Sequence, residues 1–371
     1  MRFHGVDSSY LMKHLAIAAL SAMGLAVFSL VSVSASPRVV VVTDDAVATL
    51  SIAINLALDQ NYRDGNSRYN HIVAINNEFR SGIDHPFVLR LRDLLFSGQI
   101  GAGVALGLTI DAPAFGGSEF ELVRFGSTAL SPMLSELADF YSDCDMPSYL
   151  HNHEALYVRA KTLLEEGLNV EHQIRFLERF WGMQFSEYMI VPVPTLPVWS
   201  AEGATIRFGD EYIACYLVGP MQTIPTARHA LGAIGLGYHQ TWQIGMTAVH
   251  EFGHSFYGVA LADFHDLLVD EARVLIPQTE VVPGYGPHEL NWGGYVEEYF
   301  VRAIDTLYTS ISRGTDAAEA ELYKQEMTGF GSIRFFYDHV LRYHESLQMY
   351  DGFSDYVQQV IEDLRAMREA T

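Results

Sequence analysis

His250, Glu251 and His254 form the pattern HExxH, whose spacing suits one particular chemistry. On a helix, side chains four positions apart lie on one face, so both imidazoles can bind one Zn²⁺. Glu251 follows the first histidine directly and cannot share that bond. It can instead hold a zinc-activated water and take its proton, as the general base of a zinc hydrolase does. The pattern therefore predicts a hydrolytic metal centre.

The residues around the pattern favour a buried helix. Residues 247–249 and 255–257 are small, apolar or aromatic, and Glu251 is the only charged residue other than the histidines in this stretch. No proline interrupts it. A solvent-facing helix with an accidental HExxH would carry more charge, so we expect the two histidines to lie at an interior site.

A catalytic zinc site needs three protein ligands and one open position. The longer pattern HExxHxxGxxH is absent, because Tyr257 and Ala260 occupy the places of its glycine and third histidine. His265 is available, but its neighbours are more typical of a helix surface. The third ligand is then expected to be a glutamate on a downstream helix. The acidic candidates are Glu271, Glu280, Glu289, Glu297 and Glu298.

Glu297 and Glu298 stand out because they lie in an otherwise aromatic and aliphatic helical segment. Burying two carboxylates there without a cation is costly. Arg302 follows Glu298 by four residues and can pair with it or orient it. The helical periodicity of the apolar residues places Glu297 nearer the buried side. The residue pattern alone therefore leaves both glutamates open.

Five short motifs carry a resemblance to a known family. They are His-Pro-Phe-Val at 85–88, Asp-Phe-Tyr at 139–141, Phe-Trp-Gly at 180–182, the HExxH segment at 250–256 and Glu-Tyr-Phe-Val-Arg-Ala at 298–303. With these motifs the chain resembles a bacterial family of secreted HExxH proteins, catalogued as a domain of unknown function, of the gluzincin type. The resemblance implies a zinc peptidase fold with Glu298 as the third ligand. Glu297 is the alternative that the residue pattern leaves open. It brings no assigned substrate.

Composition and charge limit the class of protein. The chain has 371 residues, of which 49% are hydrophobic, enough for a large core. A net charge of −22 and the absence of any Lys/Arg run exclude nucleic acid as a partner. Cys144 and Cys215 either form one disulfide in an oxidising compartment or remain two buried thiols.

The first 35 residues have the composition of a signal peptide. Arg2 and Lys13 precede an apolar run at 15–33, and small residues follow at 33–35. We expect cleavage after this segment and a secreted or periplasmic chain, with an uncleaved membrane anchor as the alternative. No second apolar stretch of spanning length occurs in the sequence.

The elements that must position the site fall into two regions, packed as one large domain. Residues 36–182 are expected to be mainly helical, and 183–371 to form a zincin-like catalytic region. A small antiparallel sheet is expected before the HExxH helix, with its last two strands in a hairpin and an edge strand that pairs with substrate. The expected strands are 39–42, 188–193, 205–208 and 212–218. The expected helices include a segment capped by Asp44 or Asp45, and 69–79, 87–96, 129–141, 153–164, 170–180, 296–311 and 354–367.

The sequence therefore predicts an α+β, gluzincin-like protein that acts as a secreted zinc metallopeptidase on a peptide or protein substrate. His250, His254 and Glu298 would bind Zn²⁺, with Glu251 as general base. Two alternatives remain: a non-proteolytic zinc-binding protein of the cell envelope, and a zinc hydrolase of a nonpeptide amide or ester. Weak candidates for stabilising an oxyanion are Tyr285 and His288.

Overall fold

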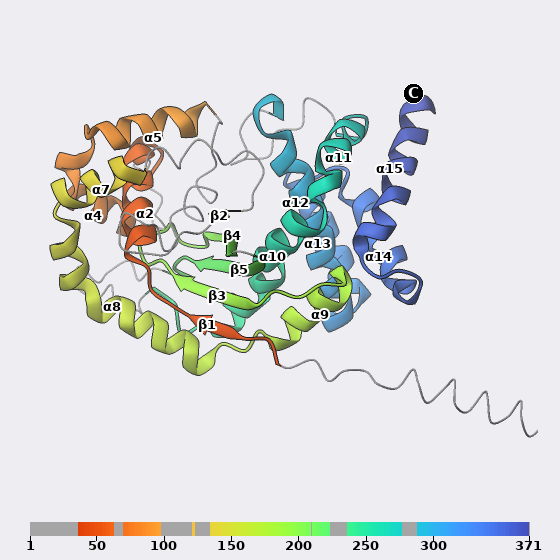
Figure 1. The fold of residues 1–371 in the computed structure, drawn as a ribbon, viewed down its shortest axis with the longest axis horizontal. Coiled ribbons are helices and arrows are strands. Elements are labelled where there is room, and N and C mark those ends of the chain that lie inside the picture. Colours follow the sequence, from red (N-terminus) through yellow and green to blue (C-terminus); the bar gives the residue numbers. More distant parts are fainter. Residues whose placement is uncertain are drawn as a thin grey trace, which may run out of the picture. The chain divides into compact units, whose positions relative to one another are not determined.

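The structure is a computed structural model of the chain (Figure 1). It describes residues 36–62, 70–97, 121–122, 134–208, 210–222, 236–276 and 288–370. Residues Pro37–Thr371 form one compact unit. The segment predicted to be a signal peptide lies outside the described residues. Among the helices in the described ranges, none is both long and apolar enough to cross a membrane.

Five strands form one mixed sheet. They are β1 (Val39–Val41), β2 (Glu121–Leu122), β3 (Glu187–Pro192), β4 (Ala201–Phe208) and β5 (Glu211–Val218), in the spatial order β1-β3-β5-β4-β2. β3 pairs in parallel with β1 and β5, whereas β4 pairs antiparallel with β5 and β2. The predicted β4–β5 hairpin is confirmed. The prediction of a purely antiparallel sheet is wrong, because parallel pairs join strands distant in sequence and leave no local turn signal.

The strand beside the HExxH helix is not an edge strand along its whole length. β4 has β5 on one side, and on the other side Ile206 and Arg207 pair with β2. β1 and β2 are the outer strands of the sheet. The expected pairing of substrate with a free edge therefore does not apply to this part of β4.

Helices make up most of the remaining described structure, which confirms the α+β class. Those before β3 are α2 (Asp45–Ala57), α3 (Asp59–Tyr62), α4 (Asn70–Glu78), α5 (Pro86–Phe96), α7 (Leu134–Asp143), α8 (Met146–Gly167) and α9 (Glu171–Trp181). Those after β5 are α10 (Thr241–Ala260), α11 (His265–Ala272), α12 (His288–Arg313), α13 (Thr315–Met327), α14 (Ile333–Glu345) and α15 (Phe353–Ala370). The cap of α2 is Asp44, whose carboxylate accepts a hydrogen bond from the Val47 N–H at 2.8 Å.

The two faces of the sheet contribute to two separate cores. On β5, Tyr216 and Val218 join the core that contains α9 and α10, whereas Cys215 and Leu217 join the core built around α2. This follows from the alternation of side chains along a strand. In Figure 1 the sheet accordingly lies between the early helices (orange to yellow) and the late helices (green to blue). Cys215 and Cys144 are free thiols.

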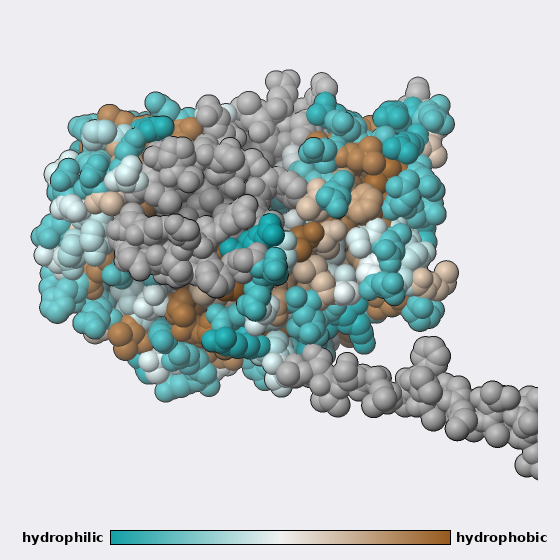
Figure 2. All heavy atoms as spheres, viewed as in Figure 1, coloured by the Kyte–Doolittle hydropathy of each residue, from teal (hydrophilic) through white to brown (hydrophobic). Residues whose placement is uncertain are grey.

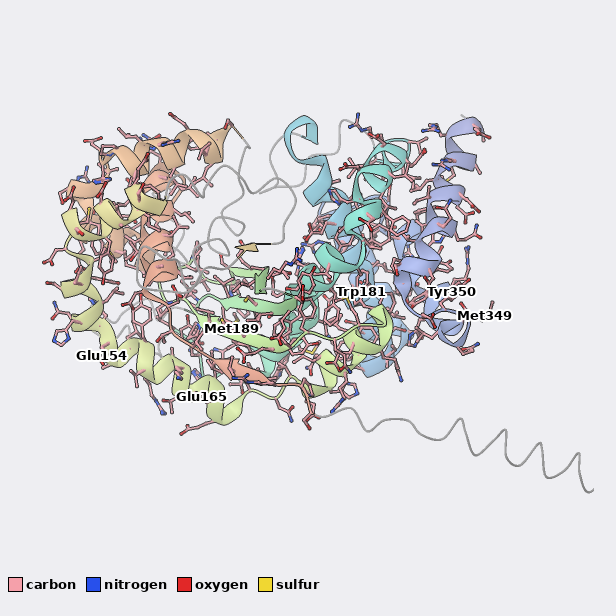
Figure 3. The ribbon with its side chains drawn as sticks, in the orientation of Figure 1. Glu154, Glu165, Trp181, Met189, Met349 and Tyr350 are labelled. Atoms are coloured by element: carbon pink, nitrogen blue, oxygen red, sulfur yellow. The ribbon has the colours of Figure 1, made fainter. Side chains whose placement is uncertain are left out.

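Aromatic packing fixes α10 against its neighbours. Trp181 at the end of α9, labelled in Figure 3, stacks on Phe256 of α10 with ring centroids 6.5 Å apart. The same indole meets Phe353 of α15 edge-on at 5.4 Å. α10 is therefore a buried, rigid element. The coloured part of the face in Figure 2 is mostly hydrophilic, with hydrophobic residues in several separate areas.

Candidate metal centre

The backbone of β4 lies directly against the HExxH turn of α10. A Cβ atom on Gly203 would lie 2.1 Å from the Glu251 carbonyl oxygen and 2.9 Å from the His254 Cβ. Ser255 lies one helical turn after Glu251, and its hydroxyl donates a hydrogen bond to the Ala204 carbonyl at 2.6 Å. Only glycine permits so close an approach, so Gly203 lets the strand hold the helix in place.

Gly203 was not predicted as part of the site. The sequence predicts a strand over 205–208, whereas β4 begins at Ala201 and includes Gly203. A lone glycine inside a strand pattern is itself a signal that another backbone approaches closely, and that signal could have identified it.

Three predicted ligands meet between α10 and α12. His250, His254 and Glu298 each offer a ligand atom, and these atoms all lie within 4.8 Å of one another. The Nε2 atoms of the two histidines are 3.5 Å and 3.4 Å from the Glu298 carboxylate oxygens. The side chains of His250 and His254 are 17% and 11% exposed, whereas the side chain of Glu298 is 2% exposed. Solvent therefore reaches the cluster from the side of the histidines. The three residues could hold a metal ion.

Glu297 lies behind the cluster and contacts a different atom. Its carboxylate is 2.7 Å from the Nδ1 of His254. A proton on Nδ1 donated to this carboxylate leaves the Nε2 lone pair directed away from Glu297, on the side of Glu298. Periodicity had placed Glu297 nearer the buried side, but both glutamates are buried, at 5% and 2% exposure. Both faces are covered because α12 packs against α10, α11, α13 and α14.

Arg302 is the guanidinium partner that the i, i+4 spacing predicted for Glu298. Its Nη2 lies 2.6 Å from a Glu298 oxygen. Its Cζ lies 4.3 Å from the centre of the Phe330 ring, a cation–π contact that holds the guanidinium in place. Glu298 is therefore fixed from one side by Arg302 and faces the two imidazoles on the other.

The electrostatics of the cluster are those of an anionic interior site. Burial would raise the pKa of Glu298, but His250, the hydrogen bond from His254 and Arg302 together lower it, so the carboxylate is charged. Burial also lowers the pKa of His250. For His254 the effect of burial is outweighed by the hydrogen bonds to Glu297 and Glu298, and its pKa rises.

The donor set fits a divalent metal. Two imidazole nitrogens and one carboxylate oxygen are the protein ligands of a common class of catalytic zinc site. Glu297 and Glu298 are buried beside the histidines, with Arg302 as the guanidinium partner of Glu298, and Glu251 is buried on the helix that carries both histidines. A divalent cation bound between the histidines and Glu298 would be stabilised by the negative charge of that carboxylate.

The other candidates for the third ligand do not join the cluster. Glu271 is buried, but Arg365 and Arg368 of α15 hold it at 2.8 Å and 2.6 Å. His265 was expected on a helix surface, and this is wrong: it is 5% exposed and its Nδ1 lies 3.2 Å from the Tyr257 hydroxyl. It is buried because α11 packs between α12 and α15.

The remaining candidates fall outside what the structure describes. Glu280 and Tyr285 lie outside the described residues. Glu289 and His288 belong to the first turn of α12, but the described part of the chain does not include their side chains.

No family model, no curated protein and no solved structure matches this chain. The resemblance to the gluzincin-type family therefore stays a prediction. Any function has to be argued from the site itself, since a fold alone does not define an activity.

Proposed function

We propose that this protein is a zinc-dependent metallopeptidase of the gluzincin type. One observation carries the proposal: Glu298 of α12 meets both HExxH imidazoles of α10 within 4.8 Å, while Glu251 lies buried on the same helix. The four residues come from two helices that are packed against each other. Such a combination of open donor set and adjacent carboxylate is the arrangement of a hydrolytic zinc site.

Two of the three residues that would hold the metal are fixed by neighbouring charged side chains. The Glu297 carboxylate fixes the Nδ1 proton of His254, and Arg302 fixes the carboxylate of Glu298. When bound by His250, His254 and Glu298, a zinc ion would supply Lewis-acid polarisation of the scissile carbonyl and would lower the pKa of water toward about 7. Ligands that are held in position before the metal binds select a metal ion by its coordination geometry as well as by its charge.

Glu251 is the residue that moves the proton. Its carboxylate accepts a proton from the attacking water as the water oxygen bonds to the carbonyl carbon. The C–N bond then breaks, and Glu251 gives the proton to the leaving amine nitrogen. The side chain is 6% exposed, which limits competing exchange with bulk water. The peptide substrate itself is supported by the resemblance to the secreted family, and the hydrolytic chemistry by the geometry.

The test uses an unbiased peptide library incubated with the wild-type chain and with Glu251→Gln. We expect new peptide termini only with the wild type, lost on chelation and restored by added zinc. Both proteins should bind zinc equally, because Glu251 is not a ligand. A zinc-loaded wild type that cleaves no peptide would contradict the proposal, as would equal cleavage by the variant.

A further inference from the structure

The loop between β3 and β4 holds a tryptophan in an unusual backbone conformation. Trp199 has φ of 66°, in the left-handed region that large side chains rarely adopt. The other non-glycine residue with positive φ in the described ranges is Asp145, a residue type that tolerates this region. A left-handed aromatic residue persists only where its surroundings enforce it, and such positions concentrate at functional sites.

Buried polar groups of the N-terminal helices anchor this loop. The Asn55 amide of α2 donates to the Thr195 carbonyl at 2.6 Å, and the Ser51 hydroxyl of α2 shares a hydrogen bond with the Thr195 hydroxyl. His71 of α4 contacts the Leu196 carbonyl through Nε2 at 2.7 Å. These hydrogen bonds lie in the interior, so the first half of the loop is rigid.

Backbone hydrogen bonds fix the second half. The Trp199 N–H donates to the Pro220 carbonyl at 2.8 Å, and the Ser200 N–H donates to the Pro197 carbonyl at 3.1 Å. The Gly219 N–H in turn donates to the Ser200 carbonyl at 2.9 Å. The backbone around Trp199 is thus held by the loop itself and by the two residues that follow β5.

The side chains of the loop are divided between interior and solvent. Leu196 and Val198 are 4% and 7% exposed, whereas Trp199 is 57% exposed. Its indole makes no hydrogen bond and no ring contact within the described part of the chain. The largest apolar group of the loop therefore faces solvent in an enforced conformation, and packing within the fold does not account for it.

Trp199 is close to the metal centre along the chain. It precedes Gly203 by four residues, and Gly203 touches the turn that carries Glu251 and His254. At about 3.3 Å per residue, Trp199 lies within roughly 13 Å of that contact. An extended peptide covers the same distance with about four residues.

We propose that Trp199 is a specificity-determining residue, which contacts an apolar or aromatic side chain of an extended peptide about four residues from the bond that is cut. This inference rests on the proposed peptidase function. The anchored loop explains how the contact is made at low cost, because a rigid aromatic group loses little freedom on binding. The buried hydrogen bonds to α2 and α4 then serve to position this residue.

The test measures binding in a zinc-loaded Glu251→Gln chain, so that it does not depend on cleavage. Labelled alanine-rich peptides, each with one phenylalanine moved along the chain, are titrated by fluorescence anisotropy. We expect one phenylalanine position to tighten binding about tenfold, the range of an added apolar contact. Adding Trp199→Gly should abolish this preference, and Trp199→Phe should retain part of it. Glycine suits φ of 66°, so the glycine variant keeps the fold.

Two matched controls distinguish the effect of the Trp199 indole from that of its backbone conformation. Asp145→Gly relieves a second positive φ without removing an aromatic group, and Trp242→Ala removes a second exposed tryptophan, 69% exposed, from α10. Neither should change the preference. A preference that survives Trp199→Gly, or no preference at any position, overturns the proposal. Trp199-dependent binding in a wild type that cleaves nothing would instead overturn only the peptidase function.

Discussion

Two buried glutamates on neighbouring helices of this protein have different partners. Glu271 of α11 and Glu298 of α12 are 4% and 2% exposed. Arg365 and Arg368 of α15 lie against the first, at 2.8 Å and 2.6 Å. The second meets one guanidinium and two imidazoles. Burial of a carboxylate is thus not by itself the mark of a functional site.

The difference lies in how the negative charge is balanced. The side chains of Arg365 and Arg368 are 40% and 52% exposed, so two permanently charged groups balance Glu271 at the rim of the fold. Around Glu298 lie the imidazoles of His250 and His254, which could bind a metal ion when neutral, and Glu297 contacts the second of them. The first arrangement is balanced by protein charges alone, whereas the second is a group that could hold a metal ion.

The largest effect is expected for Glu298→Ala. A structural zinc site with four ligands is worth about 10–16 kcal/mol, or roughly 2.5–4 kcal/mol per ligand. We therefore expect zinc affinity to fall by about 70-fold to 900-fold, measured by competition with a chelating dye. The matched Glu271→Ala should leave zinc affinity unchanged. Equal affinity in wild type and Glu298→Ala would assign the third ligand elsewhere.

A smaller effect is expected for Glu297→Gln. The glutamine keeps an oxygen near the Nδ1 of His254 but removes the charge that raises the basicity of the imidazole. Loss of such an outer carboxylate costs about 10- to 100-fold in metal affinity. The same dye competition measures it. A loss as large as that of Glu298→Ala would instead make Glu297 a direct ligand.

Glu271→Ala tests the other glutamate of the comparison, and it should change the stability of the protein rather than its activity. Removing a partner from a fully buried pair costs about 3–5 kcal/mol, but here water can solvate the two half-exposed arginines, so we expect about 1–2 kcal/mol. The free energy of unfolding is measured with urea on the zinc-loaded chain. Peptide cleavage should stay at the wild-type rate. A stable variant that has lost activity would reverse the roles given to the two glutamates.

A pH-dependent effect is expected in the same C-terminal region, at His339 of α14. It is 2% exposed and its Nδ1 lies 3.2 Å from the Tyr356 hydroxyl. Burial, together with Arg342, lowers its pKa to about 4, while Asp363 acts in the opposite direction. The folded state then binds fewer protons than the unfolded state between about pH 6.5 and pH 4. Stability from this residue is full above pH 6.5 and is lost as the pH falls through that window.

The variant His339→Gln isolates this contribution. Between pH 7 and pH 4.5, the wild type should lose about 2 kcal/mol more unfolding free energy than the variant does. Urea unfolding at several pH values gives the difference. Parallel pH profiles for the two proteins would show that His339 titrates normally in the folded state.

Features defined by local spacing were predictable from the sequence. The i, i+4 rule placed His250 and His254 on one face, and the same rule paired Arg302 with Glu298. The cap at Asp44 and the β4–β5 hairpin also follow from short-range chemistry. Each of these features depends on residues within a few positions of one another or within one hairpin.

Most features defined by distant segments were not predictable from residue patterns, and the approach of Glu298 to the two histidines was expected from the family resemblance. β1 pairs in parallel with β3 although almost 150 residues separate them, since the register pairs Val39 with Tyr188. The arginines that neutralise Glu271 lie on α15, far along the chain. Arg365, for example, follows Glu271 by 94 residues. Periodicity placed only Glu297 near the buried side because it assumes one buried face, whereas α12 is covered on two faces and Glu298 is buried as well.

The most direct test of the central claim is the metal content of the purified full chain. Elemental analysis compares the wild type with a His250→Ala, His254→Ala double variant and with the matched Glu271→Ala. We predict about one zinc per chain in the wild type and in Glu271→Ala, and none in the double variant. A wild type without zinc after incubation with the metal, or the same zinc content in the double variant, would contradict the assignment of His250, His254 and Glu298 as a metal centre.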